Sequence, residues 1–423
     1  MLEVNRIRQE KEAIIKALTK RGEEVGAIIN LIIDEDDKRK SIQAESDKLL
    51  AEANSISKQI GELFKSGMRD EAEEMKKRPL ELKEDIQRLK EEMNSVEEEI
   101  KNLLYSIANV PHHSVPAGQS EEDNEVVMTE GEVPKLHEGA VPHWELAEKY
   151  GLIDFEAGVK ITGAGFPVYT GRGAKLQRAL IAFFLDEAEK AGFKEIIPPH
   201  VVNEASGYGT GQLPDKEGQM YHMQVDDLYM IPTAEVPVTN LFRDVILKED
   251  EMPIKRSAYT PCFRREAGSY GKDVRGLNRL HQFDKVEIVV IEHPEESYAM
   301  LESMVAHVVD LLRKLELPFR KLRLCGGDLG FTSALTFDME VFSAAQERWL
   351  EVSSISNFET YQANRLKLRY RGADKKNRLA HTLNGSALAL PRILAALLEN
   401  NQTPEGIKIP SVLVPYTRFD LIS

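Results

Sequence analysis

Residues 75–107 read MKKRPLELKEDIQRLKEEMNSVEEEIKNLLYSI, and apolar residues recur in this stretch every three or four positions. One row of them has a spacing of seven: Met75, Leu82, Leu89, Val96 and Leu103. A second row has the same spacing and is offset by four: Pro79, Ile86, Met93, Ile100 and Ile107. Two such rows form the seam of a helix that packs along another helix, with glutamate and lysine on its outer side.

The segment before this stretch carries the repeat less strictly. Its apolar positions are Ile42, Leu49, Ile56 and Leu63, with Ala53 and Ile60 between them. Gly67 lies between the two runs and permits a turn. The sequence therefore predicts an antiparallel helical hairpin over about residues 28–107, with limbs of about 37–40 residues and roughly 55–60 Å. Pro79 predicts either the first turn of the return helix or a kink in it.

The motif alone leaves two interpretations of this hairpin open. It is either a spacer or dimerisation coil, or a surface that contacts phosphates. The second interpretation depends on basic residues in the distal part: Lys58, Lys65, Arg69, Lys76, Lys77 and Arg78. Acidic residues are interleaved with them and favour a solvated face equally: Glu62, Asp70, Glu71, Glu73 and Glu74.

The composition of the whole chain narrows its class. Its 423 residues suggest two or three domains, and 42% hydrophobic with 30% charged residues is typical of globular proteins. No apolar run is long enough for a membrane span, and the first residues lack a secretory signal pattern. Cys262 and Cys325 are too few for a disulfide framework and lack zinc-site spacing, so we expect a reducing cytoplasm. The net charge of −15 argues against a general nucleic-acid binder and restricts any RNA contact to local, shape-driven recognition.

A change of pattern marks the second half of the molecule. Residues 109–138 are rich in Pro, Gly, Ser, Asp and Glu and are expected to be a linker between domains at 1–108 and 139–423. After it, short apolar stretches such as 286–291 alternate with helical segments such as 174–191. This pattern predicts an α+β domain built on a largely antiparallel sheet.

Two clusters in this domain combine arginine with features that suit an anionic ligand, although the common phosphate-binding loops and the HExxH and GxSxG motifs are absent. The first is Phe263-Arg264-Arg265-Glu266, followed by a glycine-rich, basic loop and then by residues 279–283. The second runs from Asn384 through small residues to Arg392, whose guanidinium can stack on a base. By motif alone, a surface salt-bridge patch and close helix–sheet packing explain these clusters as well.

A third cluster is Glu351-Val352-Ser353-Ser354. A carboxylate with nearby hydroxyls can hold magnesium, which takes few protein oxygens together with phosphates. Strict strand alternation places Glu351 and Ser353 on one face, and Val352 and Ser354 on the other. A polar edge strand is the alternative explanation.

Taken in order, these clusters resemble the three motifs of class II aminoacyl-tRNA synthetases. Motif 1, the dimer-forming element, resembles residues 192–199, which end at Pro199; motif 2 resembles residues 263–283, and motif 3 the stretch ending at Arg392. More specific strings are similar to seryl-tRNA synthetases of the ordinary bacterial type: GTGQLP at 209–214, TAE at 233–235, FRREAG at 263–268, HQFDKVE at 281–287, EVSSISN at 351–357 and HTLNGS at 381–386. The resemblance covers nearly the whole chain, including the helical hairpin.

This resemblance implies a serine–tRNA ligase, which forms seryl-adenylate from serine and ATP and passes the seryl group to the 3′-terminal ribose of tRNA(Ser); charging of tRNA(Sec) stays open. It implies the following ATP-binding residues: Arg264, Arg265, Glu266, Arg279, Leu280, Phe283, Glu351, Val352, Ser353, Ser354 and Arg392. It implies the following serine-binding residues: Thr233, Ala234, Glu235, Arg264, Glu287, Asn384 and Ser386. Mg²⁺ is expected at Glu351 and Ser354, zinc is not expected, and the residues implied as catalytic are Arg264, Glu351 and Arg392.

The family pattern also implies individual roles. Arg264 holds the α-phosphate and the serine carboxylate, Glu266 reads the adenine amino group, and Arg279 contacts phosphates. Phe283 and Arg392 enclose the adenine ring. The serine ammonium falls to Thr233 and Glu235, and the serine hydroxyl to Glu287 and Ser386, with Asn384 nearby. In this family the hairpin reaches across a homodimer to the long variable arm of the tRNA.

The sequence departs from the family at a few places outside these positions. Gly165 and Asn364 stand where arginine is common, Phe342 where tryptophan is common, and Phe358 where cysteine is common. They leave local packing and tRNA contacts in question rather than the chemistry.

Three competing functions are weighed against the resemblance. A relative that loads a carrier protein lacks the long hairpin and has a different amino-acid pocket, so the heptads, Glu287 and Ser386 argue against it. A threonine-specific enzyme uses zinc, for which this chain has no ligand set. A non-catalytic coiled-coil binding protein would not need Arg264, Glu351 and Arg392.

Overall fold

The computed structural model describes residues 1–215, 218–266 and 275–423. It divides the chain into two compact units, one of residues 2–19 and 23–108, the other of Met1 with residues 20–22 and 109–423. Ala267 and Gly268, which end the FRREAG string, lie outside the described residues. Within the described ranges, no helix combines the length and the apolar character that a membrane crossing requires.

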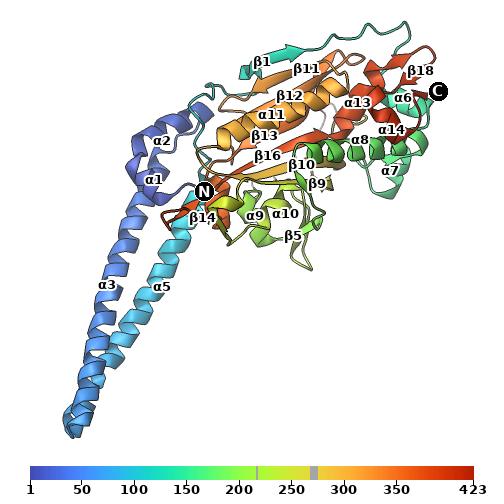
Figure 1. Cartoon of the computed structure of the whole chain (residues 1–423). Helices are drawn as coiled ribbons and strands as arrows, with labels where there is room; N and C mark the ends of the chain where they lie inside the picture. The colour runs from blue at the N-terminus through green and yellow to red at the C-terminus, as the bar shows by residue number, and fades with distance from the viewer. Residues whose placement is uncertain (216–217, 267–274) are drawn as a thin grey trace. The chain divides into compact units, whose positions relative to one another are not determined.

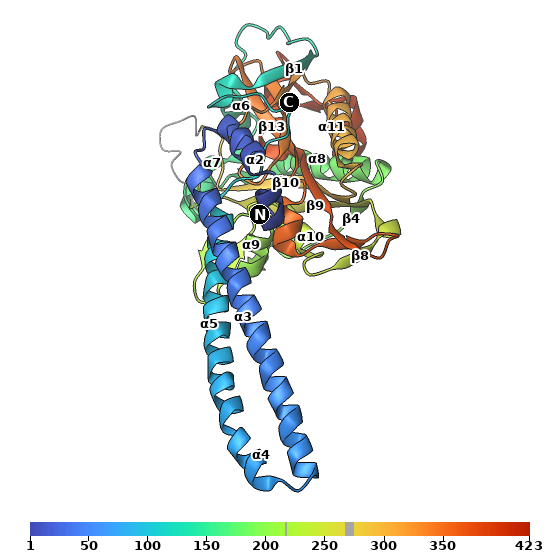
Figure 2. The same ribbon diagram turned by 90° about the vertical axis from the view of Figure 1, so that its left-hand side faces the viewer.

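The first unit is helical. Its helices are α1 (Val4–Gln9), α2 (Lys11–Leu18), α3 (Gly26–Lys65), α4 (Arg69–Met75) and α5 (Lys77–Ser106). Helices α3 and α5 run antiparallel beside each other, with α4 at the end of the hairpin (Figure 2). The side chains buried along α5 are mostly seam residues: Leu82, Leu89, Val96, Ile100 and Leu104. The predicted hairpin, called the arm from here on, is confirmed.

The return limb of the arm is shorter than predicted. Helix α3 has 40 residues and α5 has 30, because the chain interrupts its helix between Met75 and Lys77. Pro79 explains the interruption, since its ring would clash with the carbonyl four residues earlier. Pro79 instead lies in the first turn of α5, where a missing N–H has no partner within the helix. Leu104 is buried in place of the predicted Leu103, since a 3.6-residue turn drifts against a strict seven-residue repeat.

A buried carboxylate fixes the start of the arm. Asp36 of α3 is 3% exposed and pairs with Arg8 of α1 at 2.7 Å, and with Lys40 at 2.8 Å. Arg39 is a third partner at 2.8 Å, and these cations supply the charge that a buried carboxylate requires. Helix α1 is therefore joined to α3 by an ion pair as well as by apolar packing.

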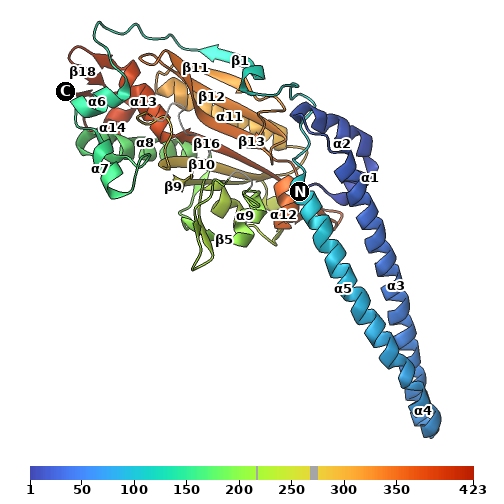
Figure 3. The same ribbon diagram turned by 180° about the vertical axis from the view of Figure 1, so that it is seen from behind.

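The second unit is built on an eight-stranded sheet with the order β1-β11-β12-β13-β16-β10-β9-β4 (Figures 1 and 3). Its strands are β1 (Glu125–Glu130), β4 (Lys194–Glu195), β9 (Ile254–Phe263), β10 (Gln282–Glu292), β11 (Phe319–Arg323), β12 (Leu335–Ser343), β13 (Arg348–Asn357) and β16 (His381–Ala389). All neighbouring pairs are antiparallel except β4 with β9. The predicted α+β fold with a largely antiparallel sheet is confirmed.

Helices and small sheets surround this sheet. The helices are α6 (His143–Lys149), α7 (Phe155–Ile161), α8 (Gly171–Lys190), α9 (Glu204–Thr210), α10 (Glu235–Asn240), α11 (Ser297–Lys314), α12 (Tyr361–Leu366), α13 (Leu390–Asn400) and α14 (Val414–Thr417). The short strands are β2 (Ile153–Asp154), β3 (Val168–Tyr169), β5 (Val201–Asn203), β6 (His222–Met223), β7 (Leu228–Met230), β8 (Ile246–Lys248), β14 (Arg369–Arg371), β15 (Asn377–Leu379), β17 (Gln402–Thr403), β18 (Gly406–Lys408) and β19 (Leu421–Ile422).

The segment expected to be a linker, residues 109–138, contributes strand β1 to the edge of the large sheet. Glu125 pairs with Arg323, and Glu130 with Phe319. An edge strand pairs on one side only, so β1 carries little of the apolar alternation by which inner strands are recognised. Val126 and Val127 are both exposed, which explains why the sequence pattern did not reveal a strand.

Strand β10 separates the core from the polar face of the sheet. Val286, Ile288 and Val290 are fully buried in the main apolar core, together with side chains of α8, α11 and α13. Successive strand residues point to opposite faces. Phe283, Lys285 and Glu287 therefore project from the other face, which we call the polar face.

Candidate functional site

The polar face brings several predicted residues together through strand register. Glu287 of β10 lies opposite Ser386 of β16, and Val289 lies opposite Asn384. Directly opposed residues in an antiparallel pair point to the same face. The register therefore places Glu287, Asn384 and Ser386 side by side.

Two buried carboxylates face each other across Asn384. The side-chain amide of Asn384 donates to Glu235 Oε2 at 2.8 Å and to Glu287 Oε1 at 3.2 Å. Glu235 is 5% exposed and Glu287 is 1% exposed. Thr233 is also buried, and its hydroxyl accepts the backbone N–H of Glu235 at 3.4 Å. We call Thr233, Glu235, Glu287, Asn384 and Ser386 the carboxylate pocket.

Two residues that the sequence analysis missed complete this pocket. Gln362 of α12 donates to Glu235 Oε1 at 2.5 Å, and its own carbonyl accepts from Thr382 at 2.7 Å. Lys285 pairs with Glu287 Oε2 at 2.8 Å. Lys285 could have been found, because it lies two residues before Glu287 and a strand places such residues on one face. Gln362 has no comparable local signal.

The charges of the pocket do not balance. Among the described residues, Glu235 and Glu287 face one buried cation, Lys285. Burial, together with the neighbouring charge of Glu287, raises the pKa of Glu235 to about 7. A buried carboxylate in this state gains most from an added cation. The pocket therefore suits a small ligand with an ammonium group.

Motif 2 begins where the chain leaves β9. The guanidinium of Arg264 lies over the ring of Phe283 at 5.2 Å, and its Nε donates to the carbonyl of Pro232 at 3.3 Å. The backbone N–H of Arg264 donates to the carbonyl of His281 at 2.9 Å. Two adjacent strands thus place one arginine between the pocket segment at Pro232 and the aromatic ring of β10.

Glu266 and Arg279 form an ion pair on either side of the segment that lies outside the described residues. Arg279 Nη1 lies 3.0 Å from Glu266 Oε2. Glu266 has a φ of +49°, a backbone conformation that is uncommon for residues other than glycine. Arg265 is exposed, and its backbone N–H donates to the carbonyl of Gln219 at 2.8 Å.

Arg392, at the start of α13, joins the second and third clusters. Its Nη1 donates to the carbonyl of Glu351 at 2.8 Å and lies 3.6 Å from the Glu351 carboxylate. Its Nε donates to the carbonyl of Asn278 at 3.1 Å. The side chain of Glu351 is 51% exposed and remains accessible to a ligand.

A β-bulge in β13 changes the predicted alternation of the Glu351 cluster. Ser354 pairs with Asp338 and Ser353 with Met339, but Glu351 pairs with Glu340 because the register shifts by one residue. The extra residue, Val352, brings Glu351 and Ser354 onto the same face. The expectation from strict alternation was therefore wrong, since it placed them on opposite faces.

An acidic side chain that the sequence analysis did not name lies beside Ser354. Asp338 is 9% exposed, and burial raises its pKa well above the ordinary value, as does the charge of Glu351. Its Oδ1 has no hydrogen-bond partner among the described residues. The side-chain atoms around Ser354 that could bind a metal are oxygens, which Mg²⁺ prefers as ligands. The described residues contain no group of three or more His, Cys, Asp or Glu arranged to hold a metal.

Four further predicted residues also have buried side chains. Leu280 is 5% exposed and Val352 is 1% exposed, both within the main core, and Ala234 is fully buried beside Val238. The hydroxyl of Ser353 donates to the carbonyl of Ser386 at 2.6 Å. A ligand can meet Leu280, Val352 and Ala234 only through their backbone groups.

Two departures from the family pattern have local partners. Gly165 has a φ of +82°, and a Cβ at this position would lie 2.5 Å from the ring of His281. Its carbonyl accepts the N–H of His281 at 2.9 Å. Asn364 donates to the carbonyl of Met1 at 2.9 Å. Gly165 therefore supports the strand that leads into β10.

Two family sequence models match the chain. The model described as "Seryl-tRNA synthetase N-terminal domain" matches residues 1–111. The model described as "tRNA synthetase class II core domain (G, H, P, S and T)" matches residues 220–401. The two matches fall on the helical unit and on the unit with the large sheet.

Full-length relatives give the same result. A serine–tRNA ligase of Salinibacter ruber is 50% identical over 421 residues, which cover 99% of this chain and 98% of the relative. The crystal structure of seryl-tRNA synthetase from Pyrococcus horikoshii complexed with ATP has a TM-score of 0.92 and 34% identity, covering 100% of this chain and 99% of that chain. Cytoplasmic serine-tRNA ligase from Naegleria fowleri in complex with AMP has a TM-score of 0.87 and 27% identity, with the same coverage.

Proposed function

Since the chain belongs to the seryl-tRNA synthetase family and is a serine–tRNA ligase, we propose that the polar face of its sheet binds serine and ATP. The observation that carries this assignment is the carboxylate pocket, in which Asn384 bridges Glu235 and Glu287. Its negative charge and its strand-borne polar groups suit a small amino acid with a hydroxyl side chain. ATP and tRNA are the other substrates of the reaction.

The serine ammonium binds Glu235 and Thr233 in this proposal. An ammonium beside Glu235 stabilises its charged form and lowers the pKa that burial has raised. The serine hydroxyl binds Glu287 and Ser386, which the register holds opposite each other. An alanine in the same place would leave these buried polar groups unpaired, so the pocket rejects it.

ATP binds along the neighbouring clusters. Arg264 contacts the α-phosphate and the serine carboxylate, which fits its place between Pro232 and Phe283. The adenine ring stacks between Phe283 and Arg392 and is read by Glu266. Arg265 and Arg279 contact phosphates, while backbone groups of Ala234, Leu280, Val352 and Ser353 line the ligands.

Glu351 and Ser354 would hold Mg²⁺ on the ATP phosphates. The bulge in β13 supports this, because it turns both side chains to one face. Asp338 adds an oxygen without a hydrogen-bond partner among the described residues, directly opposite Ser354. When bound, the ion neutralises phosphate charge.

The chemistry needs no nucleophile from the protein. A serine carboxylate oxygen attacks the α-phosphorus, the bond to pyrophosphate breaks, and pyrophosphate leaves. A ribose hydroxyl of the tRNA then attacks the seryl carbonyl carbon and releases AMP. Arg264 holds both reacting groups, so the protein contributes alignment and charge stabilisation.

The arm is the part that we propose for binding tRNA(Ser). Exposed cations lie near the end of α3, at the start of α4 and at the start of α5. Lys76 and Arg78 are already paired with glutamates. In the part of the chain that the structure describes, four others form no ion pair and are therefore the better phosphate ligands: Lys58, Lys65, Arg69 and Lys77.

A homodimer through motif 1 is the proposed assembly. Ile197 follows the edge strand β4 and is 83% exposed, and it leads directly to Pro198 and Pro199. A large apolar side chain beside an open sheet edge suits a protein contact. The size of the particle in solution, measured by sedimentation, would be twice the chain mass.

Amino-acid-dependent exchange of pyrophosphate into ATP tests the assignment of the pocket. Each of the twenty amino acids is supplied separately to the purified full chain. We expect rapid exchange with serine and far slower exchange with alanine or threonine. Equal exchange with alanine would contradict the proposed roles of Glu287 and Ser386.

A further inference from the structure

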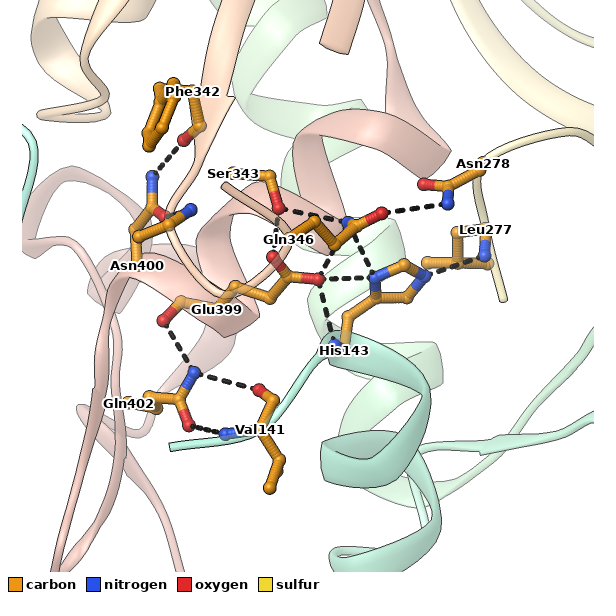
Figure 4. A network of polar contacts seen from close by, with 11 residues as sticks. Val141, His143, Leu277, Asn278, Phe342, Ser343, Gln346, Glu399, Asn400 and Gln402 are labelled. Carbon is orange, nitrogen blue, oxygen red and sulfur yellow. Dashed lines mark hydrogen bonds and ion pairs between the residues drawn. The ribbon is translucent and has the colours of Figure 1, made fainter. Parts of the chain in front are cut away.

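His143 is a buried histidine whose two ring nitrogens have different partners. It is the first residue of α6 and has no exposed surface. Its Nε2 lies 2.8 Å from the backbone N–H of Leu277, and its Nδ1 lies 2.6 Å from Glu399 Oε1 (Figure 4). Because a backbone N–H can only donate, Nε2 must be the acceptor and the ring hydrogen must be on Nδ1. His143 is therefore neutral and donates to Glu399.

Glu399, near the end of α13, fixes the orientation of this ring. It accepts the backbone N–H of His143 at 2.9 Å, Gln346 Nε2 at 2.9 Å and the hydroxyl of Ser343. Burial raises its pKa, but the hydrogen bonds from His143 and Ser343 outweigh burial and bring the pKa below the ordinary value. The carboxylate is thus charged and saturated with donors. The 3.4 Å approach of Gln346 Nε2 to His143 Nδ1 joins two donors and is a contact rather than a hydrogen bond.

The same network holds the chain that returns from motif 2. Gly276 has a φ of +67°, and a Cβ there would lie 2.2 Å from His143 Nε2. Asn278 donates from its side chain to Gln346 Oε1 at 2.9 Å. The carbonyl of Asn278 accepts from Arg392 Nε at 3.1 Å. Residues 276–278 are therefore in contact with the ring at one end and with Arg392 at the other.

We propose that His143 and Glu399 are positioning residues for ATP, which fix residues 276–278 so that Arg279 and Arg392 are held in their ATP-binding places. The proposal rests on the roles given above to these two arginines. Arg279 directly follows the fixed segment and pairs with Glu266, while Arg392 is oriented by the carbonyl of Asn278. Among the residues that the structure describes, no contact of His143 or Glu399 reaches the carboxylate pocket, so we expect serine binding to be independent of them.

The replacement His143→Phe tests this separation. Phenylalanine keeps a planar ring of similar size but neither accepts from Leu277 nor donates to Glu399. We expect the KM for ATP in serine-dependent exchange to rise about tenfold, as for one buried hydrogen bond left unmade, and the KM for serine to change less than twofold. His143→Gln should restore most of the ATP affinity, because its amide supplies one acceptor and one donor.

Asn400→Ala is the matched control. Asn400 follows Glu399 and is the last residue of α13. Its side chain donates to the carbonyl of Phe342 at 2.8 Å and accepts the backbone N–H of Ala344 at 2.9 Å, which holds the end of β12 and the residue after it. Its loss should lower the melting temperature and leave the KM for ATP unchanged. Gly276→Ala is a second probe, and it is available if His143→Phe does not fold. The added Cβ should displace residues 276–278 from the ring of His143 and raise the KM for ATP.

The outcomes separate the two levels of inference. An unchanged KM for ATP in His143→Phe, or equal increases in both KM values, would overturn the positioning role. So would an equal effect of Asn400→Ala, which would make the network merely structural. If His143→Phe does not fold, an unchanged KM for ATP in Gly276→Ala would overturn it. If the unaltered chain showed no serine-dependent exchange, the proposed function itself would fail instead.

Discussion

The arm and the polar face of the sheet differ in whether their charged side chains are exposed or buried. Along the arm, the buried side chains are mainly apolar seam residues, and the charges that can meet a ligand are exposed. On the polar face, ionisable groups such as Glu235, Lys285 and Glu287 are themselves buried. Exposed charges are screened by salt and select a ligand weakly. Buried polar groups disfavour any ligand that leaves them unpaired. This difference supports the proposals that the arm binds tRNA and that the polar face binds serine.

The largest effect is expected from Arg264→Ala. The side chain is proposed to hold both reacting groups, while its backbone bond to His281 would survive the change. Serine-dependent pyrophosphate exchange should fall by roughly 10³-fold, the scale for loss of one transition-state donor. Arg256→Ala is the control, since the guanidinium of Arg256 on β9 also lies over a phenylalanine ring, that of Phe242, and donates to the carbonyl of Lys255. A variant Arg264→Ala with a tenth of the normal rate would contradict the assignment.

The second effect concerns the arm. Replacing Lys58, Lys65, Arg69 and Lys77 by glutamine should lower kcat/KM for tRNA charging by about a hundredfold and flatten its dependence on salt. Pyrophosphate exchange should stay normal. The double replacement of Lys76 and Arg78, which already pair with glutamates, is the control and should have a smaller effect. Equal effects of both sets would mean that the choice of phosphate ligands is wrong.

The third effect is a pH dependence of serine binding. The pKa of Glu235 is raised from 4.5 to about 7, so the free enzyme holds a neutral Glu235 below that pH. The ammonium needs the charged form, so kcat/KM for serine should fall about tenfold for each pH unit below 7. The free energy of unfolding changes in the opposite sense, because neutral Glu235 stabilises the fold. Its contribution is fully present below pH 4.5 and is lost as the pH rises through about 7. Glu235→Gln should bind serine weakly at all pH values and lose the inflection; an inflection below pH 5.5 in the unaltered chain would refute the prediction.

The smallest effect is expected from Ser386→Ala. Loss of one hydrogen bond to the serine hydroxyl should lower kcat/KM for serine about tenfold. Alanine as a substrate has no hydroxyl to bind, so the much lower rate of alanine activation should not change in this variant. The ratio of serine to alanine activation, measured by exchange, should therefore shrink by the same factor. An unchanged ratio would remove Ser386 from the specificity site.

The two regions also differ in how far the sequence predicts them. The seam of the arm is a local repeat, so its helices and its turn at Gly67 followed from spacing alone. The break before Lys77 did not, because Pro79 was weighed as a first-turn residue or a kink and not as the cause of a separate α4. The sheet depends on pairings between distant strands, and β1 escaped prediction because an edge strand carries little alternation.

In the site, strings of neighbouring residues were predictable and their relative placement was not. The bulge at Val352 reverses which side Glu351 faces, and no residue in the string marks it. Gln362 reaches Glu235 across 127 positions from another helix, so no local pattern points to it. The network of His143 and Glu399 joins residues 256 positions apart and became visible only in the fold.

The most direct test of the separate roles proposed for the arm and the polar face measures pyrophosphate exchange and tRNA charging on the same chain with a shortened arm. Removing residues 43–95 and joining the ends with glycines keeps Asp36 paired with Arg8. We predict normal serine-dependent pyrophosphate exchange together with loss of tRNA(Ser) charging. Normal charging by the shortened chain would contradict the account, and so would loss of exchange in a variant that still melts cooperatively.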